Sequence, residues 1–255
     1  MGRVRIWIGL NGERLFVWAF VVVFLAVVAF LLYFGMPFHG SEASVQSVYD
    51  DDRITVERTD GGGYVMRPAD ANTQRGLVFY PGARVHPDAY LASLAPLVRD
   101  ANTTVVVPKM ALNLAVLDQG AAGHVIDRHE EIQRWYVGGH SLGGAMACRY
   151  ARDNSERVSG LVLFGAYCDK SIAQTNLRVL SVRGDADTVL DEGAYERNRE
   201  NLPSTTTHSV LAGVNHTQFG SYTGQRGDQP SGTSYDVAHR RLAETTVPWF
   251  RNATG

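Results

Sequence analysis

The stretch RWYVGGHSLGGAMACRYARD (Arg134–Asp153) joins an apolar run to a segment with helical spacing. The junction GHSLG, residues 139–143, has the form G-x-S-x-G, in which a serine sits on a sharp turn between a strand and a helix. The glycines are needed there because a Cβ at either position would collide with the neighbouring strand or helix. A glycine-rich turn with a structural serine is the alternative. The apolar run before the turn and the helical pattern after it favour a nucleophile at Ser141.

A serine hydroxyl needs a base within hydrogen-bond reach, and that base needs a third group to orient it. The run VLSVRGDADTV, residues 179–189, ends an apolar strand in two aspartates. A carboxylate just past a strand lies at the same edge of a parallel sheet as the serine. We prefer Asp187 as the acid, because the gap after Gly184 lets the loop turn back toward the site. Asp185 is expected to cap the turn, and Asp169 is a third candidate.

The run LAGVNHTQFG, residues 211–220, places His216 in a loop after the last apolar strand. The chain order Ser141, Asp187, His216 is the order that the elbow motif requires of its triad. A lone loop histidine is usually a surface residue, but this order favours His216 as the base. His140 lies inside the elbow and is expected to point elsewhere.

A tetrahedral intermediate also needs N–H donors for its oxyanion, each worth about 3–4 kcal/mol of barrier. One donor is expected at Leu142, the residue after the nucleophile. The other is expected in the loop 80–83 that follows the strand GLVFY, with Ala83 as the donor. An ordinary Pro-Gly turn is the alternative for that loop.

Along the remaining chain, short apolar strands alternate with segments of helical spacing. This alternation predicts an α/β fold with a mostly parallel sheet and helices on both faces. The first two strands are predicted to form an antiparallel hairpin at its edge. The strands are predicted at 54–58, 63–67, 76–80, 103–107, 134–138, 160–165, 177–182 and 208–211, and the helices at 87–100, 111–133 (broken near Gly120 and Gly123), 142–152, 191–201 and 234–250.

The N-terminal region contains 20 consecutive residues without a charge, LFVWAFVVVFLAVVAFLLYF at 15–34. A helix of this length spans the roughly 30 Å apolar core of a bilayer. Arginines at positions 3, 5 and 14 precede it and acidic residues follow, so residues 1–14 are predicted to be cytoplasmic and the remainder extracytoplasmic. A cleaved signal peptide and a buried core helix are the alternatives; the apolar stretch is longer than that of a usual signal peptide.

Residues 35–52 are polar and are predicted to be a linker, so that the folded domain occupies 53–255. The net charge of −2 and the lack of basic runs exclude a nucleic-acid footprint. In an extracytoplasmic domain Cys148 and Cys168 could pair, but two buried free thiols are the preferred interpretation, because the spacing does not fix the Cα separation. No Cys/His cluster indicates a metal site.

The chain resembles the α/β-hydrolases of the compact, dienelactone-hydrolase-like kind over roughly 54–250. The segments that carry this resemblance are FYPGARVHPDAY (79–90), VPKMALNLAV (107–116), VGGHSLGGAMACRYA (137–151), RGDADTV (183–189) and GVNHTQFGSYTGQRGD (213–228). The resemblance implies a sheet of about eight strands. It also implies Ser141, Asp187 and His216 as the triad and the N–H groups of Ala83 and Leu142 as the oxyanion hole.

Two departures from the family are visible. Many members carry His-Gly where this chain has Pro81-Gly82, and dienelactone hydrolases proper use cysteine as the nucleophile. Cap domains of the fold usually follow the strand at 160–165, but only residues 166–176 separate it from the next strand. No cap domain is therefore expected. The polar loop 220–234 is the candidate cover. Arg226 or Asp228 could contact a polar substrate there, although a solvated loop is the preferred interpretation, and Asn113 is expected to border the pocket as a polar contact.

These features predict a membrane-anchored serine hydrolase that cleaves a carboxylic ester or related acyl bond of a small molecule, with no metal or organic cofactor. An acyltransferase with the same triad and a non-catalytic binding protein on the same fold are the alternatives. The sequence leaves the oligomeric state open.

Overall fold

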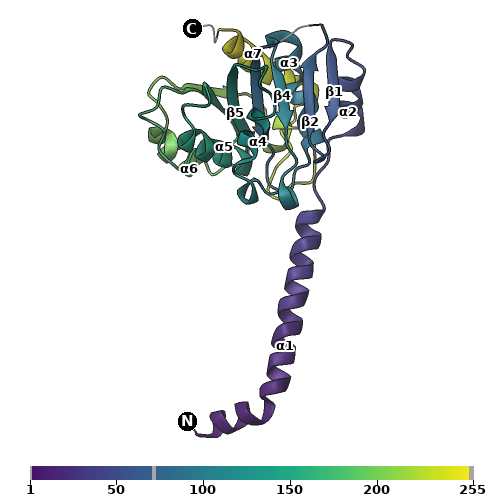
Figure 1. Ribbon diagram of the computed structural model, residues 1–255, viewed down its shortest axis with the longest axis vertical. Coiled ribbons are helices and arrows are strands. Elements are labelled where there is room, and N and C mark those ends of the chain that lie inside the picture. The colour runs from purple at the N-terminus through teal and green to yellow at the C-terminus, as the bar shows by residue number, and fades with distance from the viewer. Residues whose placement is uncertain (1, 71–72, 253–255) are drawn as a thin grey trace. The chain divides into compact units, whose positions relative to one another are not determined.

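The computed structural model describes residues 2–70 and 73–252, with side chains described from Glu13 onward. The chain divides into two compact units, residues 1–36 and 37–255. The first unit is the helix α1 (Gly2–Gly35), drawn in purple in Figure 1. Its segment Glu13–Gly35 has a mean hydropathy of 3.1 and is not buried within the protein. The expected apolar helix is thus present, and it is long and apolar enough to cross a membrane. Met1 and the side chains of Arg3 and Arg5 lie outside the described residues.

The second unit is built on an eight-stranded sheet with the order β1-β2-β4-β3-β5-β6-β7-β8. Strands β1 and β2 form an antiparallel hairpin, and β2 also pairs with β4 in the antiparallel direction. All other neighbouring strands are parallel. This topology confirms the predicted fold class. The strands are β1 (Ile54–Arg58), β2 (Tyr64–Pro68), β3 (Arg75–Tyr80), β4 (Thr104–Val107), β5 (Arg134–His140), β6 (Gly160–Phe164), β7 (Arg178–Gly184) and β8 (Thr207–Leu211).

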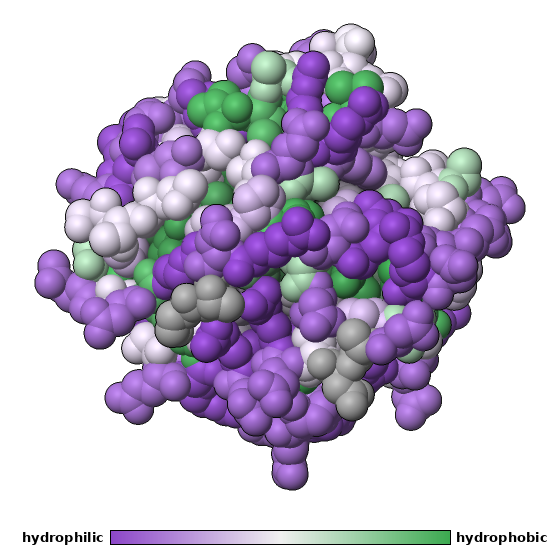
Figure 2. All heavy atoms as spheres, turned by 90° about the horizontal axis from the view of Figure 1, so that it is seen from above, coloured by the Kyte–Doolittle hydropathy of each residue, from purple (hydrophilic) through white to green (hydrophobic). Residues whose placement is uncertain are grey.

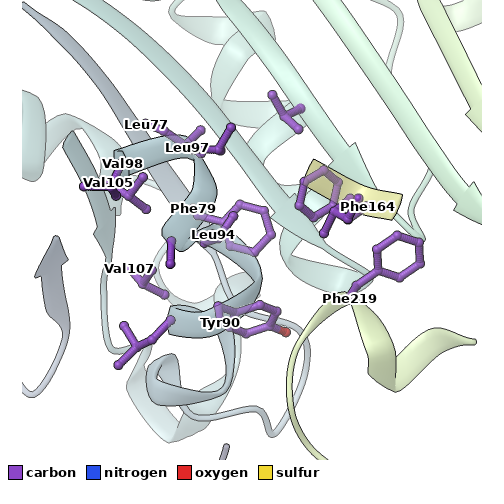
Figure 3. Close-up of a cluster of buried hydrophobic side chains, with 14 of the residues drawn as sticks. Leu77, Phe79, Tyr90, Leu94, Leu97, Val98, Val105, Val107, Phe164 and Phe219 are labelled. Atoms are coloured by element: carbon purple, nitrogen blue, oxygen red, sulfur yellow. The ribbon is translucent and has the colours of Figure 1, made fainter. Parts of the chain in front are cut away.

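Helices cover both faces of the sheet and create two apolar cores (Figure 1). On one face α3 (Leu91–Ala101) and α7 (Tyr235–Arg251) pack on alternate strand residues, with the 3-10 turn η1 (Pro87–Tyr90) leading into α3. Figure 3 shows this layer, in which Leu94 and Tyr90 meet Phe79 of β3. On the other face lie α4 (Ala121–Ile126) and α5 (Leu142–Asp153). The short helix α6 (Glu192–Arg197) and the 3-10 turn η4 (Asn198–Asn201) follow β7.

The predicted helix at 111–133 is largely absent. The structure has two 3-10 turns, η2 (Ala111–Asn113) and η3 (Ala115–Leu117), before α4 begins after Gly120. Leu112 and Asn113 adopt positive φ angles of 49° and 56°, which a continuous right-handed helix cannot contain. The local backbone therefore overrides an apolar pattern that suits a helix.

The structure also differs from the predicted linker at 35–52, because residues from Pro37 onward fold with the second unit. Ser41 caps the helix α2 (Glu42–Tyr49), and Val48 on this helix is only 3% exposed. Phe38 forms a parallel bridge with Val85. The three aspartates that suggested a flexible stalk are partly used in structure, since Asp51 forms ion pairs with arginines of the domain.

The two edges of the sheet differ in character. The edge at which the parallel strands begin is covered mainly by hydrophilic side chains (Figure 2), and its polar hollow is lined by Gln74, Arg75, Asn102, Gln133 and Arg134. The opposite, carboxyl edge carries the predicted site residues. Residues 165–177 between β6 and β7, all of them described, form no helix, as the expectation of no cap domain requires.

Candidate active site

Ser141 occupies the turn between β5 and α5 in a strained conformation. Its φ and ψ angles are 54° and −125°, a combination that costs about 1–3 kcal/mol and persists only where the surroundings impose it. A Cβ on Gly139 would lie 2.5 Å from the backbone of Gly143, and one on Gly143 would lie 2.2 Å from the carbonyl oxygen of Tyr80. Both glycines are therefore required by close backbone approach. The strained turn presents the partly exposed serine to a pocket at the sheet edge.

Asp187 and His216 lie together, although 29 residues separate them in the chain. His216 Nδ1 is 2.8 Å from Asp187 Oδ2, and each side chain is 1% exposed. The other carboxylate oxygen accepts the N–H groups of Val189 and Leu190, each at 2.9 Å. These bonds fix the carboxylate, so that the imidazole donates its Nδ1 proton to it. The acceptor nitrogen Nε2 is then left available.

His216 Nε2 is buried and has no hydrogen-bond partner among the described residues. His216 and Ser141 line the same pocket. A buried imidazole nitrogen without a partner costs free energy, and in a native structure such an exception often has a functional reason. The arrangement leaves this nitrogen for a proton from a group in the pocket.

The loop after β8 holds His216 through its backbone. The 3-10 turn η5 (His216–Phe219) is capped by Asn215 and Gln218 in a reciprocal capping box. Asp228 accepts the N–H groups of His216 (3.2 Å) and Thr217 (2.9 Å). Asp228 was predicted as a substrate contact; the structure uses its carboxylate to brace the histidine loop. Asp228 lies 12 residues after His216 in the chain, so no local sequence pattern reveals this contact.

Asp185 faces away from this arrangement. Its side chain accepts the N–H of Gly213 at 2.5 Å, and the residue is exposed. The sequence-based expectation that Asp185 caps a turn agrees with this contact. The structure therefore brings Asp187, not Asp185, to His216.

The loop after β3 is held against the start of α5 by a buried polar relay. The N–H of Gly82 donates to the hydroxyl of Tyr90 (2.9 Å), and this hydroxyl lies 2.9 Å from His140 Nδ1. The tyrosine hydroxyl thus bridges the N–H of Gly82 and the ring of His140. Burial lowers the pKa of His140 well below its ordinary value, and repulsion from the neighbouring His216 imidazole adds to this effect. No pattern in the sequence pointed to Tyr90 in this role.

The two predicted oxyanion donors flank this junction. Leu142 is the first residue of α5, so its N–H has no acceptor within the helix, and its side chain lines the pocket. Ala83 follows the Gly82 turn and is partly exposed, but it is not among the residues that line the pocket. The structure thus brings the loop to the elbow and leaves the donor at Ala83 a prediction.

The pocket beside Ser141 has a volume of about 390 Å³. Its apolar wall comes from α5 and from the loop after β7, and includes Leu142, Ala145, Met146, Val189 and Leu190. At its rim, Arg149 forms a two-pronged ion pair with Asp169, at 3.1 and 2.6 Å. The preceding residues, Cys148 and Cys168, form a disulfide. The pairing that the sequence left open is thus present, and it joins α5 to the loop after β6.

Two predicted substrate contacts lie elsewhere. Asn113 is buried in the loop after β4, where its carbonyl oxygen accepts from the N–H of Arg84 (2.9 Å) and its side chain accepts from Lys109. Arg226 lies in the loop 220–234, next to Gly227 and Asp228, which contact Thr188 and His216. Neither residue is among those that line the pocket next to Ser141.

The sequence profile of the alpha/beta hydrolase family matches residues 76–239. The chain therefore belongs to the alpha/beta hydrolase family. No curated protein matches it.

Solved structures with the same fold include two hydrolases of distant sequence. A predicted CIB-like hydrolase from Thermoplasma acidophilum is 16% identical with a TM-score of 0.51, covering 78% of this chain and 98% of that one. The esterase domain of a Rhodothermus marinus protein is 11% identical with a TM-score of 0.58, covering 79% of this chain and 98% of that one. At such identities the likeness concerns the fold.

Proposed function

We propose that this chain is a serine hydrolase that cleaves a carboxylic ester or a related acyl bond through an acyl-enzyme. The observation that carries the proposal is the buried bond between Asp187 and His216 next to the strained Ser141. This bond supplies the two groups that serine needs to act as a nucleophile, a base and an acid that orients the base.

In the proposed reaction His216 Nε2 takes the proton of the Ser141 hydroxyl as the serine oxygen attacks the carbonyl carbon of the substrate. Asp187 holds the ring and stabilises the imidazolium that forms. The N–H groups of Leu142 and Ala83 would bind the oxyanion. His216 then returns the proton to the leaving group. In the second half, it activates the water that cleaves the acyl-enzyme.

The acyl group is proposed to occupy the pocket of about 390 Å³ between α5 and the loop after β7. Its wall of Leu142, Ala145, Met146, Val189 and Leu190 suits an apolar chain rather than a charged one. At the rim, the guanidinium of Arg149 forms an ion pair with Asp169. Because this pair has no net charge, the rim does not favour an anionic substrate.

The protein is further proposed to be anchored in the cell membrane by α1, with its hydrolase unit outside the cytoplasm. The apolar span Glu13–Gly35 and the three arginines that precede or open it support this orientation. The disulfide Cys148–Cys168 fits an oxidising compartment. Protease added to intact spheroplasts should digest the hydrolase unit; complete protection would contradict the orientation.

The central test uses the full-length protein in detergent with a panel of p-nitrophenyl esters of increasing chain length. Ser141→Ala is expected to abolish turnover and labelling by a fluorophosphonate while the unfolding temperature stays close to that of the wild type. Ser204→Ala, which changes an exposed serine, is the matched control and should behave as the wild type. Ester hydrolysis retained by Ser141→Ala would refute the assignment of the nucleophile.

A further inference from the structure

A second cluster of chemically competent side chains lies outside the proposed active site. His39, from the segment that precedes α2, meets His86 and Asp88, from the loop between β3 and α3. His39 Nδ1 is 2.8 Å and His86 Nδ1 is 3.0 Å from the same oxygen, Asp88 Oδ2. The two imidazole rings stack with their centroids 4.3 Å apart. Both nitrogens therefore lie beside Asp88 Oδ2.

Two imidazole nitrogens and a carboxylate oxygen are ligand types that first-row divalent cations accept. The three donor atoms lie within 4.8 Å of one another. Zinc binds histidine nitrogen and carboxylate oxygen at about 2.0–2.2 Å, so the ligand atoms of a tetrahedral site are about 3.4 Å apart. The observed contacts of 2.8 and 3.0 Å need to widen by only about 0.5 Å to admit the ion.

The surroundings of Asp88 also match those of a ligand carboxylate. Its other oxygen, Oδ1, accepts the N–H of Gly40 at 2.9 Å, which leaves Oδ2 for the two histidines. Such outer hydrogen bonds orient the ligands of metal sites.

One of the two histidines is largely buried, and the other is open to solvent. The side chain of His86 is 10% exposed, whereas that of His39 is 56% exposed. An ion can therefore enter from solvent and meet a largely preformed pair of ligands. The two histidines are 47 residues apart in the chain, so no ligand spacing in the sequence could reveal the site.

We propose that His39 Nδ1, His86 Nδ1 and Asp88 Oδ2 bind one divalent cation of the zinc class, with water completing the coordination. The ion clamps the segment 37–41, which immediately follows α1 in the chain, onto the loop between β3 and α3. The site is independent of the proposed hydrolysis, because it shares no residue with the active site.

A competing role for His86 is that of a helix cap. Its Nδ1 lies 3.3 Å from the backbone nitrogen of Asp88 and caps η1. His86→Asn separates the two roles, because asparagine is among the best capping residues yet lacks the imidazole ligand.

The test is calorimetric titration of Zn²⁺ into the full-length, metal-stripped protein in detergent, prepared without a histidine tag. The wild type is expected to bind one ion per chain and to unfold at a higher temperature with Zn²⁺ than without it. Loss of an outer-shell partner alone lowers metal affinity about 10–100-fold. His39→Ala and His86→Asn are therefore expected to lose at least that much.

His129→Ala is the matched control. His129 also faces a carboxylate, Glu131 Oε1 at 3.0 Å, but among the described residues it belongs to no three-ligand cluster, so its replacement should leave Zn²⁺ affinity unchanged. The proposal is overturned if the wild type binds no Zn²⁺, or if His39→Ala or His86→Asn binds it as tightly as the wild type. Esterase activity is not the readout, so failure here leaves the proposed function intact.

Discussion

Two buried histidines lie side by side at the carboxyl edge of the sheet, and their surroundings differ in kind. The rings of His140 and His216 are 4.3 Å apart. His216 Nδ1 contacts the carboxylate of Asp187, whereas His140 Nδ1 contacts the neutral hydroxyl of Tyr90. The same side chain is thus placed next to a charge in one case and next to a phenol in the other.

The regions that supply these partners differ in the same way. The His216 region consists of the loops after β7 and β8, where two aspartates, Asp187 and Asp228, accept hydrogen bonds from backbone and ring. The His140 region is mainly aromatic: the ring packs against Phe219 and Tyr222 as well as near Tyr90. Figure 3 shows Phe219 and Tyr90 at the margin of the same apolar layer.

These different surroundings suit the two adjacent histidines to different roles, His216 to proton transfer and His140 to positioning a loop. A carboxylate stabilises the imidazolium form, so His216 can accept a proton during the proposed reaction. Burial against neutral groups disfavours the imidazolium, so His140 stays neutral and its ring serves to position the loop after β3.

The largest expected effect comes from replacing the charged carboxylate of Asp187, the partner of His216, by a neutral amide. Asp187→Asn should lower kcat/KM about 10⁴-fold, because the amide no longer selects the tautomer that leaves Nε2 free. Asp185→Asn is the paired control, since asparagine can still accept the N–H of Gly213. Steady-state kinetics on the best ester of the panel gives both values. Equal losses in the two variants would mean that the acid has been misassigned.

The second effect concerns the segment 37–52, which contacts the aromatic residues around His140. Phe38 stacks on Tyr222 with ring centroids 5.7 Å apart, and Tyr222 in turn packs on His140. A chain that starts at Arg53 also loses the buried Val48. Since burying one such side chain contributes about 1.5–3 kcal/mol, this chain should be less stable by several kcal/mol than one that starts at Pro37.

Urea unfolding of the two truncated chains measures the difference. The chain from Pro37 is expected to be recovered without detergent and to keep esterase activity, because it retains the whole second unit. Equal stability of the two chains would show that residues 37–52 are the flexible linker that their composition suggests.

The two regions also differ in how far the sequence reveals them. The elbow and the pair Asp187–His216 lie just past apolar strands, and parallel strands bring the residues after their carboxyl ends to one edge of the sheet. Strand periodicity and chain order were therefore sufficient to predict that Asp187 and His216 meet. The elbow glycines could be interpreted in the same way, because their need for close approach is a property of the turn itself.

The His140 region depends on contacts that no period or spacing encodes. In the sequence Tyr90 is one more apolar position at the start of a helix, and its hydroxyl finds Gly82 and His140 only in the folded chain. The segment around Phe38 is polar on average, yet the ring of Phe38 and the buried side chain of Val48 pack against the domain. Composition averages over a segment, whereas docking depends on single side chains.

A third, smaller effect is expected from Tyr90→Phe, which removes the hydroxyl between Gly82 and His140. Leaving the buried N–H of Gly82 and the ring nitrogen of His140 without a partner costs about 1–3 kcal/mol of stability for each unsatisfied group. If the relay positions the oxyanion loop, kcat should fall while KM changes little, because the oxyanion exists only after attack.

Tyr222→Phe is a suitable control, since its hydroxyl bonds to Gln225 and not to the relay. It should leave kcat within error of the wild type. A Tyr90→Phe variant with wild-type kcat but reduced stability would limit the relay to a structural role.

The smallest effect is the contribution of His140 to the pH dependence of stability. Its pKa in the folded protein is lowered, first by burial and second by electrostatic repulsion from the neighbouring His216 imidazole. In the unfolded chain it takes up a proton below about pH 6.5, so the free energy of unfolding falls with decreasing pH at up to about 1.4 kcal/mol per unit. His140→Asn should flatten this slope between about pH 6.5 and pH 5. His208 and His239, whose pKa values are also lowered by burial, remain in both proteins, so the difference between the two slopes reports His140. Identical slopes would mean that His140 is protonated in the folded state, and the contrast between the two histidines would then rest on geometry alone.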